Sequence, residues 1–430
     1  MEYKMKLTDE EKAILQGSQG ETMQKVMRTL VLYGDTFDAE KMVPLTHKAS
    51  HLVTSFGLGM ITPVYNIMDE LIQAGIVTEE KFTMDPRPLD YENVKCNFIE
   101  KLVFNKFMYT KQDDYEAQLK KVGLKDDNAF SCTCYLEQVG NIPKKGDVIS
   151  WAESSAVVYA NSVLGARCNR NSALIELFGS IAGVVPYFGL LTDEGRKADW
   201  IIEVKTSKIP EAQVLGSAIG LKVMEDVPYI VGLDPYLGTE IDARAQAYLK
   251  DMGAATASNG AVGLFHVENL TPEAKEHGRA LIKEGAQTFV VDDKVLEQTI
   301  AGYPIMWKDK EATPKLCFIG CPHLSLSQLD DWTAALTENL EKNGKSKVQV
   351  RTVLTSAPDV IEAFKKTENY RRLLQTGATL TSICPLMYMN NPIAGKKAVM
   401  TNSNKLRTYT MARYYTDAEV LERVCGKEGI

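Results

Sequence analysis

The chain has 430 residues, a formal net charge of −7 and a globular composition in which 45% of the residues are hydrophobic. This length predicts two to three domains, and the lack of a basic cluster argues against nucleic-acid binding. No apolar run reaches the length of a membrane span, and the charged N-terminus lacks a signal-peptide core, so a cytoplasmic protein is expected.

The first third of the chain is predicted to combine helices with polar loops. Residues 8–33 have helical spacing, and Thr8 with Glu11 forms a capping-box pattern at their start. Residues 45–59 are rich in histidine, serine and glycine. They fit either a loop that lines a cleft or a loop with buried, hydrogen-bonded histidines. Residues 82–90 form a second loop with two prolines.

The stretch from Asp147 to Asn171 carries the most chemistry of the N-terminal half. Its middle has the spacing of a buried helix that ends at the glycine of L-G-A-R. Ser154 and Asn161 lie two turns apart on one face, so this polar stripe must find partners or face a ligand. Arg167 and Arg170 follow, and guanidinium groups suit a carboxylate or a phosphate. The alternative is an internal network of ion pairs and serines bonded to their own helix.

From Trp200 onward, strand-like apolar runs alternate with helical ones. This alternation predicts an α/β arrangement with a largely parallel sheet. Thr271 and Pro272 are expected to open a helix that Gly285 closes. Residues 206–305 carry few groups able to do chemistry, so we interpret them as a packing domain.

The C-terminal third is predicted to continue the α/β pattern. One strand ends in the sequence C-P-H, and Ser325 with Gln328 forms a capping box for the next helix. Residues 357–374 are predicted to form one helix. Cys384 precedes a proline, and a further strand leads to T-N-S-N-K at 401–405.

The eight cysteines include no C-x-x-C pair, which argues against a zinc finger or a thioredoxin-like motif. In the cytoplasm they are expected to be reduced, as core residues, ligands or catalysts. Cys132, Cys321 and Cys384 each lie at the end of an element, where sites in α/β sheets are built. Three such thiols could hold an iron–sulfur cluster with one iron left open, although packed core cysteines are the commoner case.

Three stretches carry a family resemblance: S-W-A-E-S-S-A-V-V-Y-A-N-S-V-L-G-A-R-C-N-R, F-I-G-C-P-H-L-S-L-S-Q-L and A-V-M-T-N-S-N-K. Together they resemble the catalytic large-subunit portion of aconitase X, from Leu7 to about Val424. The resemblance implies an α/β fold, the aconitase-like multi-domain α/β/α catalytic portion without the swivel domain. The expected divisions are 1–205 with the site helix, 206–307 as the packing domain and 308–430 as the C-terminal α/β domain.

The same resemblance implies an iron centre, either an iron–sulfur cluster or a mononuclear iron, with the ligands Cys132, Cys321 and Cys384. The catalytic residues that it suggests are Glu153, Lys405 and Ser403. Six further residues are expected to bind the substrate, some because of the resemblance and the polar groups of 161–170 because of their chemistry. They are Ser55, Asp85, Ser154, Asn161, Arg167 and Arg170.

Three stretches depart from the family pattern. The chain has S-C-T-C-Y where the family commonly has T-C-T-P-Y, so Cys134 is a rival ligand. Cys168 and Asn171 replace a threonine and a glutamate of the family pattern. The loop that contains Asp85 departs from the usual T-x-N-P.

The resemblance predicts a hydro-lyase that eliminates water from a small carboxylate-bearing hydroxy acid. The first interpretation is a cis-3-hydroxy-L-proline dehydratase. The alternatives are a mevalonate 5-phosphate dehydratase large subunit, a non-catalytic iron–sulfur or metal-binding scaffold, and an α/β binding protein without metal. The family places its proton-accepting serine on a swivel domain that this chain is not expected to contain. A separate small swivel-domain subunit is therefore the expected partner, with Ser403 as the fallback base.

Overall fold

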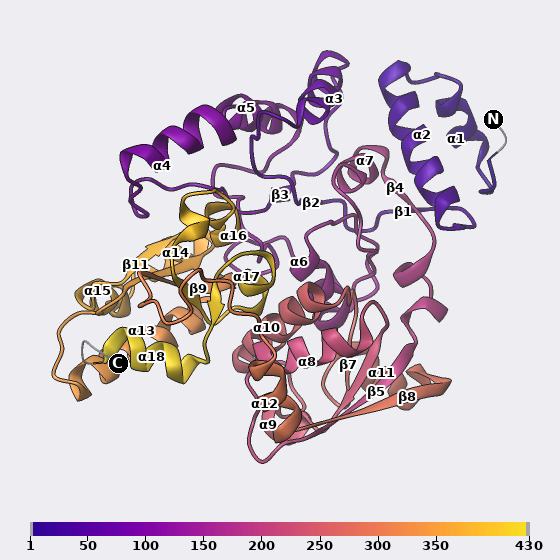
Figure 1. The fold of residues 1–430 in the computed structure, drawn as a ribbon. Helices are drawn as coiled ribbons and strands as arrows, with labels where there is room; N and C mark the ends of the chain where they lie inside the picture. The colour runs from indigo at the N-terminus through magenta and orange to yellow at the C-terminus, as the bar shows by residue number, and fades with distance from the viewer. Residues whose placement is uncertain (1–2, 427–430) are drawn as a thin grey trace.

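The computed structural model describes residues 3–426, and its helices and parallel sheets confirm the predicted α/β architecture. Figure 1 shows the N-terminal third at the top and two sheet-containing regions below it. Helix α6 (Ser154–Tyr159) lies near the centre, where the three regions meet. Among the described residues, no helix is both long enough and apolar enough to cross a membrane.

The N-terminal region is mainly helical and contains two short strand pairs. β1 (Met42–Pro44) pairs antiparallel with β4 (Val184–Pro186), and β2 (His51–Leu52) pairs parallel with β3 (Thr83–Met84). A hydrophobic core of its own holds this region together. Its helical segments are α1 (Asp9–Leu15), α2 (Glu21–Thr36), α3 (Thr62–Gln73), α4 (Phe98–Val103), the π-helical η1 (Phe104–Met108), α5 (Gln112–Val122), α7 (Ile175–Ala182), and the 3-10 turns η3 (Gly189–Leu191) and η4 (Glu194–Arg196).

The local signals for helix ends are confirmed. Thr8 and Glu11 form the predicted capping box: the Glu11 N–H donates to Thr8 Oγ1 at 3.2 Å and the Thr8 N–H donates to Glu11 Oε2 at 2.7 Å. Ser325 and Gln328 form the second box. Helix α6 continues into the π-helical segment η2 (Ala160–Leu164), which Gly165 ends at φ 76°. Such left-handed backbone favours glycine.

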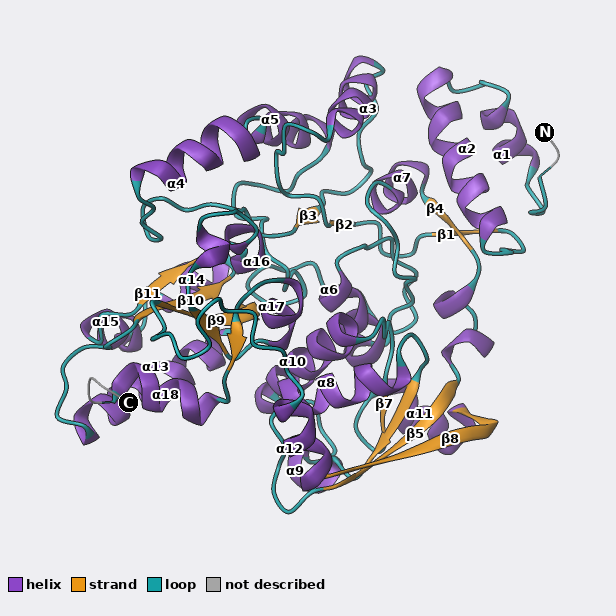
Figure 2. Ribbon diagram, viewed as in Figure 1, coloured by secondary structure: helices purple, strands orange, loops and turns teal. Residues whose placement is uncertain are grey.

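The second region is built on a parallel sheet in the order β7-β6-β5-β8. Figure 2 shows the helices of this region beside the sheet. The strands are β5 (Ala198–Lys205), β6 (Pro228–Val231), β7 (His266–Val267) and β8 (Ile282–Asp292). The helical segments are α8 (Ala212–Val223), α9 (Asp234–Leu237), α10 (Ala243–Asn259), α11 (Pro272–His277), the 3-10 turn η5 (Gly278–Leu281) and α12 (Asp293–Ala301).

Two expectations for this region need correction. The expected division after residue 205 cuts the sheet, because β5 lies between β6 and β8. The helix that begins at Pro272 ends at His277 and not at Gly285, because Gly278 takes a positive φ of 53° and begins the turn η5 that leads into β8. Gly285 instead lies within β8, at a register shift against β5.

The third region is a parallel sheet in the order β11-β10-β9-β12-β13. The strands are β9 (Leu316–Leu324), β10 (Arg351–Ser356), β11 (Thr379–Thr381), β12 (Val399–Thr401) and β13 (Arg413–Tyr414). The helical segments are α13 (Leu326–Lys342), α14 (Pro358–Phe364), α15 (Glu368–Gln375), α16 (Pro385–Met389), the 3-10 turn η6 (Ala394–Lys396), α17 (Asn404–Tyr409) and α18 (Asp417–Cys425). The single helix predicted over 357–374 is two, because the backbone becomes extended at Thr367.

The largest hydrophobic core joins α6 and η2 to the helices and strands of both sheet regions. The start of α6 is thereby fixed between the N-terminal loops and the third region. This placement brings together residues that are up to about 350 positions apart in the chain.

Candidate active site

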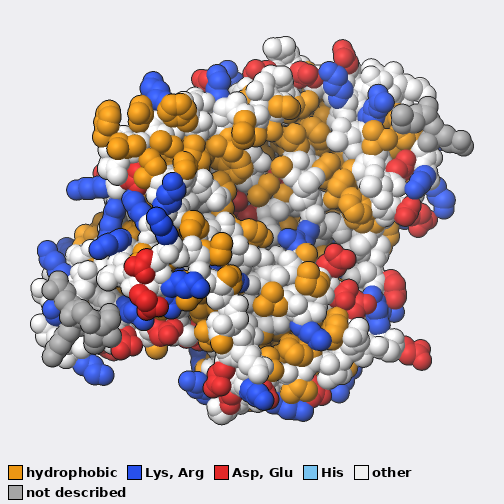
Figure 3. Space-filling model, in the orientation of Figure 1, with side chains coloured by type: hydrophobic (Ala, Val, Ile, Leu, Met, Phe, Trp, Pro, Cys, Tyr) orange, Lys and Arg blue, Asp and Glu red, His pale blue; other side chains and the backbone are white. Residues whose placement is uncertain are grey.

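A cavity of about 380 Å³ lies where the N-terminal loops, the start of α6 and the third region meet. Figure 3 shows that this face of the molecule is hollowed between its upper and lower parts. The loops that follow β2 and β3 contribute to one side, and β9, α16 and α17 contribute to the other. The predicted site residues that line the cavity are Ser55, Asp85, Cys132, Glu153, Ser154, Cys321, Cys384 and Lys405.

The three predicted cysteine ligands reach this cavity from separate segments. Cys132 lies in a loop, Cys321 in β9, and Cys384 at the N-cap of α16. Burial raises the pKa of each thiol, to about 12 for Cys384 and well above the usual value for Cys132. The Lys405 charge opposes this effect at all three thiols. Without a bound cation the thiols are therefore protonated, and a metal would have to displace these protons.

Glu153 and Lys405 form a buried ion pair on the cavity wall. Their side chains are 2% and 13% exposed, and the Lys405 ammonium also donates to Ser155 Oγ at 3.2 Å. Burial alone raises the pKa of Glu153, but Lys405 and the hydrogen bonds from Ser155 and Ala156 lower it to about 2. Burial lowers the pKa of Lys405, but Glu153 and the nearby thiols raise it well above its usual value. Both groups are therefore charged at neutral pH.

Asp85 adds a second carboxyl group to the cavity. Its Oδ1 lies 3.7 Å from His51 Nε2, and neither atom has a hydrogen-bond partner among the described residues. Burial raises the pKa of Asp85 to about 6. Burial lowers the pKa of His51, but Cys134 and Asp85 raise it to about 10. Cys134, the rival ligand, thus lies beside His51, and it is not among the residues that line the cavity.

Ser403 does not line the cavity. Its hydroxyl donates to the Cys321 carbonyl oxygen and accepts the Leu406 N–H at 3.1 Å, and the side chain is 1% exposed. With the proton engaged and the oxygen capping α17, Ser403 is not placed to take a proton from a substrate. Its expected role as fallback base therefore has no support in this geometry, which assigns it to holding Cys321.

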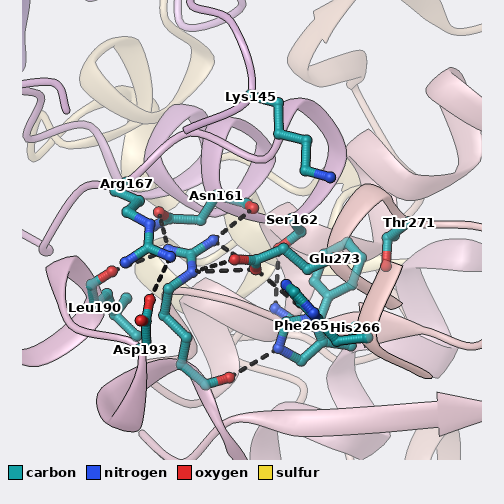
Figure 4. Close-up of polar contacts among 12 residues, drawn as sticks. Lys145, Asn161, Ser162, Arg167, Leu190, Asp193, Phe265, His266, Thr271 and Glu273 are labelled. Carbon is teal, nitrogen blue, oxygen red and sulfur yellow. Dashed lines mark hydrogen bonds and ion pairs between the residues drawn. The ribbon is translucent and has the colours of Figure 1, made fainter. Parts of the chain in front are cut away.

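Asn161 and Arg167 also lie outside the cavity, in the internal network that was the alternative to substrate binding (Figure 4). Asn161 Oδ1 accepts from the Arg196 guanidinium at 3.0 Å, and Arg196 in turn forms a bidentate pair with Glu273. Arg167 donates to the Leu191 carbonyl and pairs with Asp193. These partners account for the polar groups, so the prediction that Asn161 and Arg167 bind substrate is not supported.

Arg170 has a different environment. Burial lowers its pKa, while the nearby Tyr409 and Glu153 raise it, and both of these neighbours line the cavity. Its aliphatic chain packs beside Gly263, where a Cβ atom would lie 3.2 Å from Arg170 Cγ. Among residues 3–426 its guanidinium forms no hydrogen bond or ion pair. Arg170 is thus a cation near the cavity that remains available to an anion.

Several cavity residues were missed by sequence reasoning. His323, Asn390 and Tyr409 line the cavity together with apolar side chains such as Phe56 and Met387. For His323 a signal existed in the C-P-H sequence, since the histidine follows Cys321 by two residues. Asn390 and Tyr409 lie in turns and helix ends that carried no recognisable pattern.

Two further observations delimit the site. A larger cavity, of about 650 Å³, lies between the second and third regions, but none of the predicted site residues lines it. Among the described residues, no three histidine, cysteine or carboxylate side chains are grouped closely enough to hold one metal ion. The three thiols of the site therefore surround the cavity, and they are not close enough together to bind one metal ion.

Comparisons with known proteins give the family context of this site. Family models match in succession, described as the aconitase X first domain over residues 4–194, second domain over 198–301 and third domain over 314–423. The crystal structure of Thermococcus kodakaraensis aconitase X in its holo form is similar, with a TM-score of 0.79 and 28% identity, over 98% of this chain and 100% of that chain.

The curated relatives differ in how much of their length the chain matches. The phosphomevalonate dehydratase large subunits of Thermococcus kodakarensis and Methanocaldococcus jannaschii are each 30% identical over 94% of this chain and 95% of their own length. The cis-3-hydroxy-L-proline dehydratase of Pseudomonas aeruginosa is also 30% identical, but over 65% of this chain and 47% of its own length. The percentage identity is therefore the same for the phosphomevalonate dehydratase large subunits and for this cis-3-hydroxy-L-proline dehydratase, whereas the share of each chain that is matched is larger for the large subunits.

Proposed function

Because the chain belongs to the aconitase X family and is a hydro-lyase of that type, we propose that it is the large subunit of a phosphomevalonate dehydratase. The observation that carries the proposal is the cavity, which gathers three thiols and a buried Glu153–Lys405 pair. The first interpretation, a cis-3-hydroxy-L-proline dehydratase, has less support than this alternative. The relatives with that name match only about two thirds of the chain.

The residues of the cavity fit an iron–sulfur cluster. Cys132, Cys321 and Cys384, the three thiols that surround the cavity, would hold it. With only three protein ligands, such a cluster would keep a position free for the substrate, and Lys405 favours the thiolate forms that binding needs. When bound, such a cluster supplies a Lewis acid for a hydroxyl group.

The chain's own residues would bind and orient the substrate. Mevalonate 5-phosphate has a carboxylate, a hydroxyl group on the β-carbon and a phosphate. Its dehydration breaks a C–H bond at the α-carbon and the C–O bond at the β-carbon, forms a double bond between them and releases water. The Lys405 ammonium is held charged, so it can bind the carboxylate and stabilise the negative charge that grows there as the α-proton leaves.

The two carboxyl groups have different parts in this proposal. Glu153, with a pKa of about 2, stays ionised and orients Lys405. Asp85, with a pKa of about 6, is mostly ionised at pH 7 but can exchange a proton close to neutral pH. Ser55 and Ser154 add hydroxyl groups to the wall. Arg170 is the proposed anchor for the phosphate, because a guanidinium without a partner suits that group.

The base that takes the α-proton is proposed to come from a separate small subunit. The relatives are named large subunits, and Ser403 is engaged inside this chain. We propose that this partner docks on an exposed apolar surface formed by Met60, Phe98, Ile99, Leu102 and Phe107, which are each 43–83% exposed. Figure 3 shows hydrophobic side chains gathered at the upper left, over α4.

This apolar surface connects directly to the cavity wall. The Tyr109 hydroxyl, just beyond η1, donates to the carbonyl of Met387, which lines the cavity. The Gly59 N–H donates to the Met108 carbonyl, which ties the loop before Met60 to the same segment. A subunit that docks on α4 and η1 could therefore reach over the cavity. Exposed apolar clusters of this kind commonly mark interaction sites.

The experiment is a substrate comparison. The chain, loaded anaerobically with iron and sulfide, is assayed with and without the small subunit on mevalonate 5-phosphate and on cis-3-hydroxy-L-proline, with loss of water followed by mass spectrometry. The proposal predicts dehydration of mevalonate 5-phosphate by the two subunits together and little by the large chain alone. Turnover of cis-3-hydroxy-L-proline instead, or full turnover without the partner, would contradict it.

A further inference from the structure

His323 joins the three cysteine-bearing segments of the cavity. It is 1% exposed and follows Cys321 by two residues in β9. Its Nδ1 lies 3.1 Å from Ser131 Oγ, and Ser131 precedes Cys132. Its Nε2 lies 3.1 Å from the carbonyl oxygen of Ile383, which precedes Cys384. Its backbone N–H donates to Cys132 Sγ at 3.4 Å.

These contacts define one arrangement of the imidazole protons. The Ile383 carbonyl can only accept, so Nε2 carries the proton and donates to it. Nδ1 is then the acceptor for the Ser131 hydroxyl. A ring that donates at one nitrogen and accepts at the other is neutral. The neutral ring therefore links two chain segments, by donating a hydrogen bond to one and accepting a hydrogen bond from the other.

We infer that His323 is a positioning residue that sets the spacing of Cys132, Cys321 and Cys384. The inference rests on the proposed ligand set and assigns no chemistry to the imidazole itself. The three segments come from the N-terminal region and from two separate parts of the third region. Because His323 binds the residue before two of the cysteines and belongs to the strand of the third, it couples all three. Metal sites need ligands held in this way, since hydrogen bonds around the ligands fix their orientation.

Other contacts hold single cysteines. Ser403 donates to the Cys321 carbonyl, and the Cys384 N–H donates to the Arg87 carbonyl at 2.8 Å. Each of these bonds acts on one ligand segment, whereas the His323 ring spans two segments beyond its own. Loss of the ring should therefore disturb the distances among the thiols more than loss of either of these contacts.

The experiment measures metal retention and not turnover. His323→Ala, His323→Gln and Ser131→Ala chains are loaded with iron and sulfide anaerobically, and bound iron is measured in competition with a chelator, together with the visible spectrum. Loss of a hydrogen-bond partner that orients metal ligands typically weakens metal binding by about 10- to 100-fold. We expect a loss of that size for His323→Ala. His323→Gln should be milder, because the glutamine amide can still donate to the Ile383 carbonyl.

His266→Ala is the matched control. His266 is also 1% exposed and lies in β7 of the second region, outside the cavity lining, and its Nε2 bonds the Arg196 carbonyl at 2.8 Å. It should destabilise the fold without weakening iron binding. Equal iron retention in His323→Ala and wild type, or equal loss in His266→Ala and His323→Ala, would overturn the inference. If His323→Ala does not fold, unchanged iron binding in both His323→Gln and Ser131→Ala would overturn it.

A Cys384→Ser chain separates this inference from the proposed function. If Cys384→Ser keeps its iron, the proposed ligand set is wrong, whatever the His323 variants do. If Cys384→Ser loses iron while His323→Ala keeps it, the ligand set stands and the positioning role of His323 fails. Loss in both, with retention in the His266 control, supports the two together.

Discussion

The buried pair of Glu153 and Lys405 allows a stability prediction that can be worked from the structure. Lys405→Met removes the cation and leaves a carboxylate that is 2% exposed without its counter-charge. The carboxylate still accepts from the Ser155 hydroxyl at 2.7 Å and from the Ala156 N–H at 2.6 Å. The loss should therefore come mainly from the missing charge and not from unmade hydrogen bonds.

The pKa of Glu153, which Lys405 lowers together with the hydrogen bonds from Ser155 and Ala156, gives the scale of the loss. A fall from 4.5 to about 2 corresponds to about 3 kcal/mol of stabilisation of the charged form. This agrees with the roughly 3–5 kcal/mol typical of breaking a buried pair by removing one partner. Because the folded pKa is depressed, the contribution is present above the unfolded pKa and is lost as the pH falls below 4.5 towards 2.

Urea unfolding at pH 7, followed by tryptophan fluorescence, measures this loss. Lys405→Met should lower the free energy of unfolding by about 3 kcal/mol. The double variant with Glu153→Gln should recover most of the loss, because the uncompensated charge is gone. Lys25→Met is the control: its pair with Glu70 is exposed by 48% and 40%, so the change should stay within about 1 kcal/mol. A loss in Lys405→Met no larger than in this control, or simple additivity in the double variant, would refute the reasoning.

Glu176, Arg170 and Phe98 each allow a further test by substitution. Burial raises the pKa of Glu176 to about 8, so the folded protein is destabilised where this carboxyl group ionises. Glu176→Gln should therefore match wild type in unfolding free energy near pH 5 and exceed it by a few kcal/mol, on the order of 4, above pH 8. A constant difference across this pH range would contradict the prediction. Arg170→Ala should raise the KM for mevalonate 5-phosphate by about 10- to 100-fold, since a hydrogen bond to a charged group contributes about 1.5–3 kcal/mol, whereas Arg167→Ala should not; equal effects would remove Arg170 from the site. Phe98→Glu should weaken binding of the small subunit in a titration, while Leu374→Glu, an exposed apolar position on α15, should leave it unchanged; unchanged binding in both would place the partner elsewhere.

Local signals in the sequence predicted local structure well. The capping boxes at Thr8 and Ser325 and the helix end at Gly165 depend on neighbours within a few residues, and all three are present. The helix predicted over 357–374 is too long, because the backbone becomes extended at Thr367, between α14 and α15. Gly285 is not the helix end that the sequence predicts, because Gly278 already ends the helix.

Whether a polar side chain is free to bind the substrate depends on its partners in the tertiary structure. Asn161 and Arg167 have the chemistry of substrate ligands, and their actual partners, Arg196 and Asp193, are 35 and 26 residues away, respectively. The sequence could not show that these partners engage them. The prediction that the three cysteines group at one site rested on the family resemblance, and their spacing in the sequence does not predict it. The links made by His323 are likewise long-range, to residues 192 and 60 positions away.

The most direct test of the account is the iron and sulfide bound by cysteine variants of the purified chain. The account predicts that Cys132→Ser, Cys321→Ser and Cys384→Ser each lose the cluster, with the loss of its visible absorbance. Cys134→Ser, whose thiol lies beside His51 and outside the cavity lining, should keep it. Retention of iron and sulfide in any of the first three variants, or loss in Cys134→Ser alone, would contradict the claim that these three thiols form the metal site.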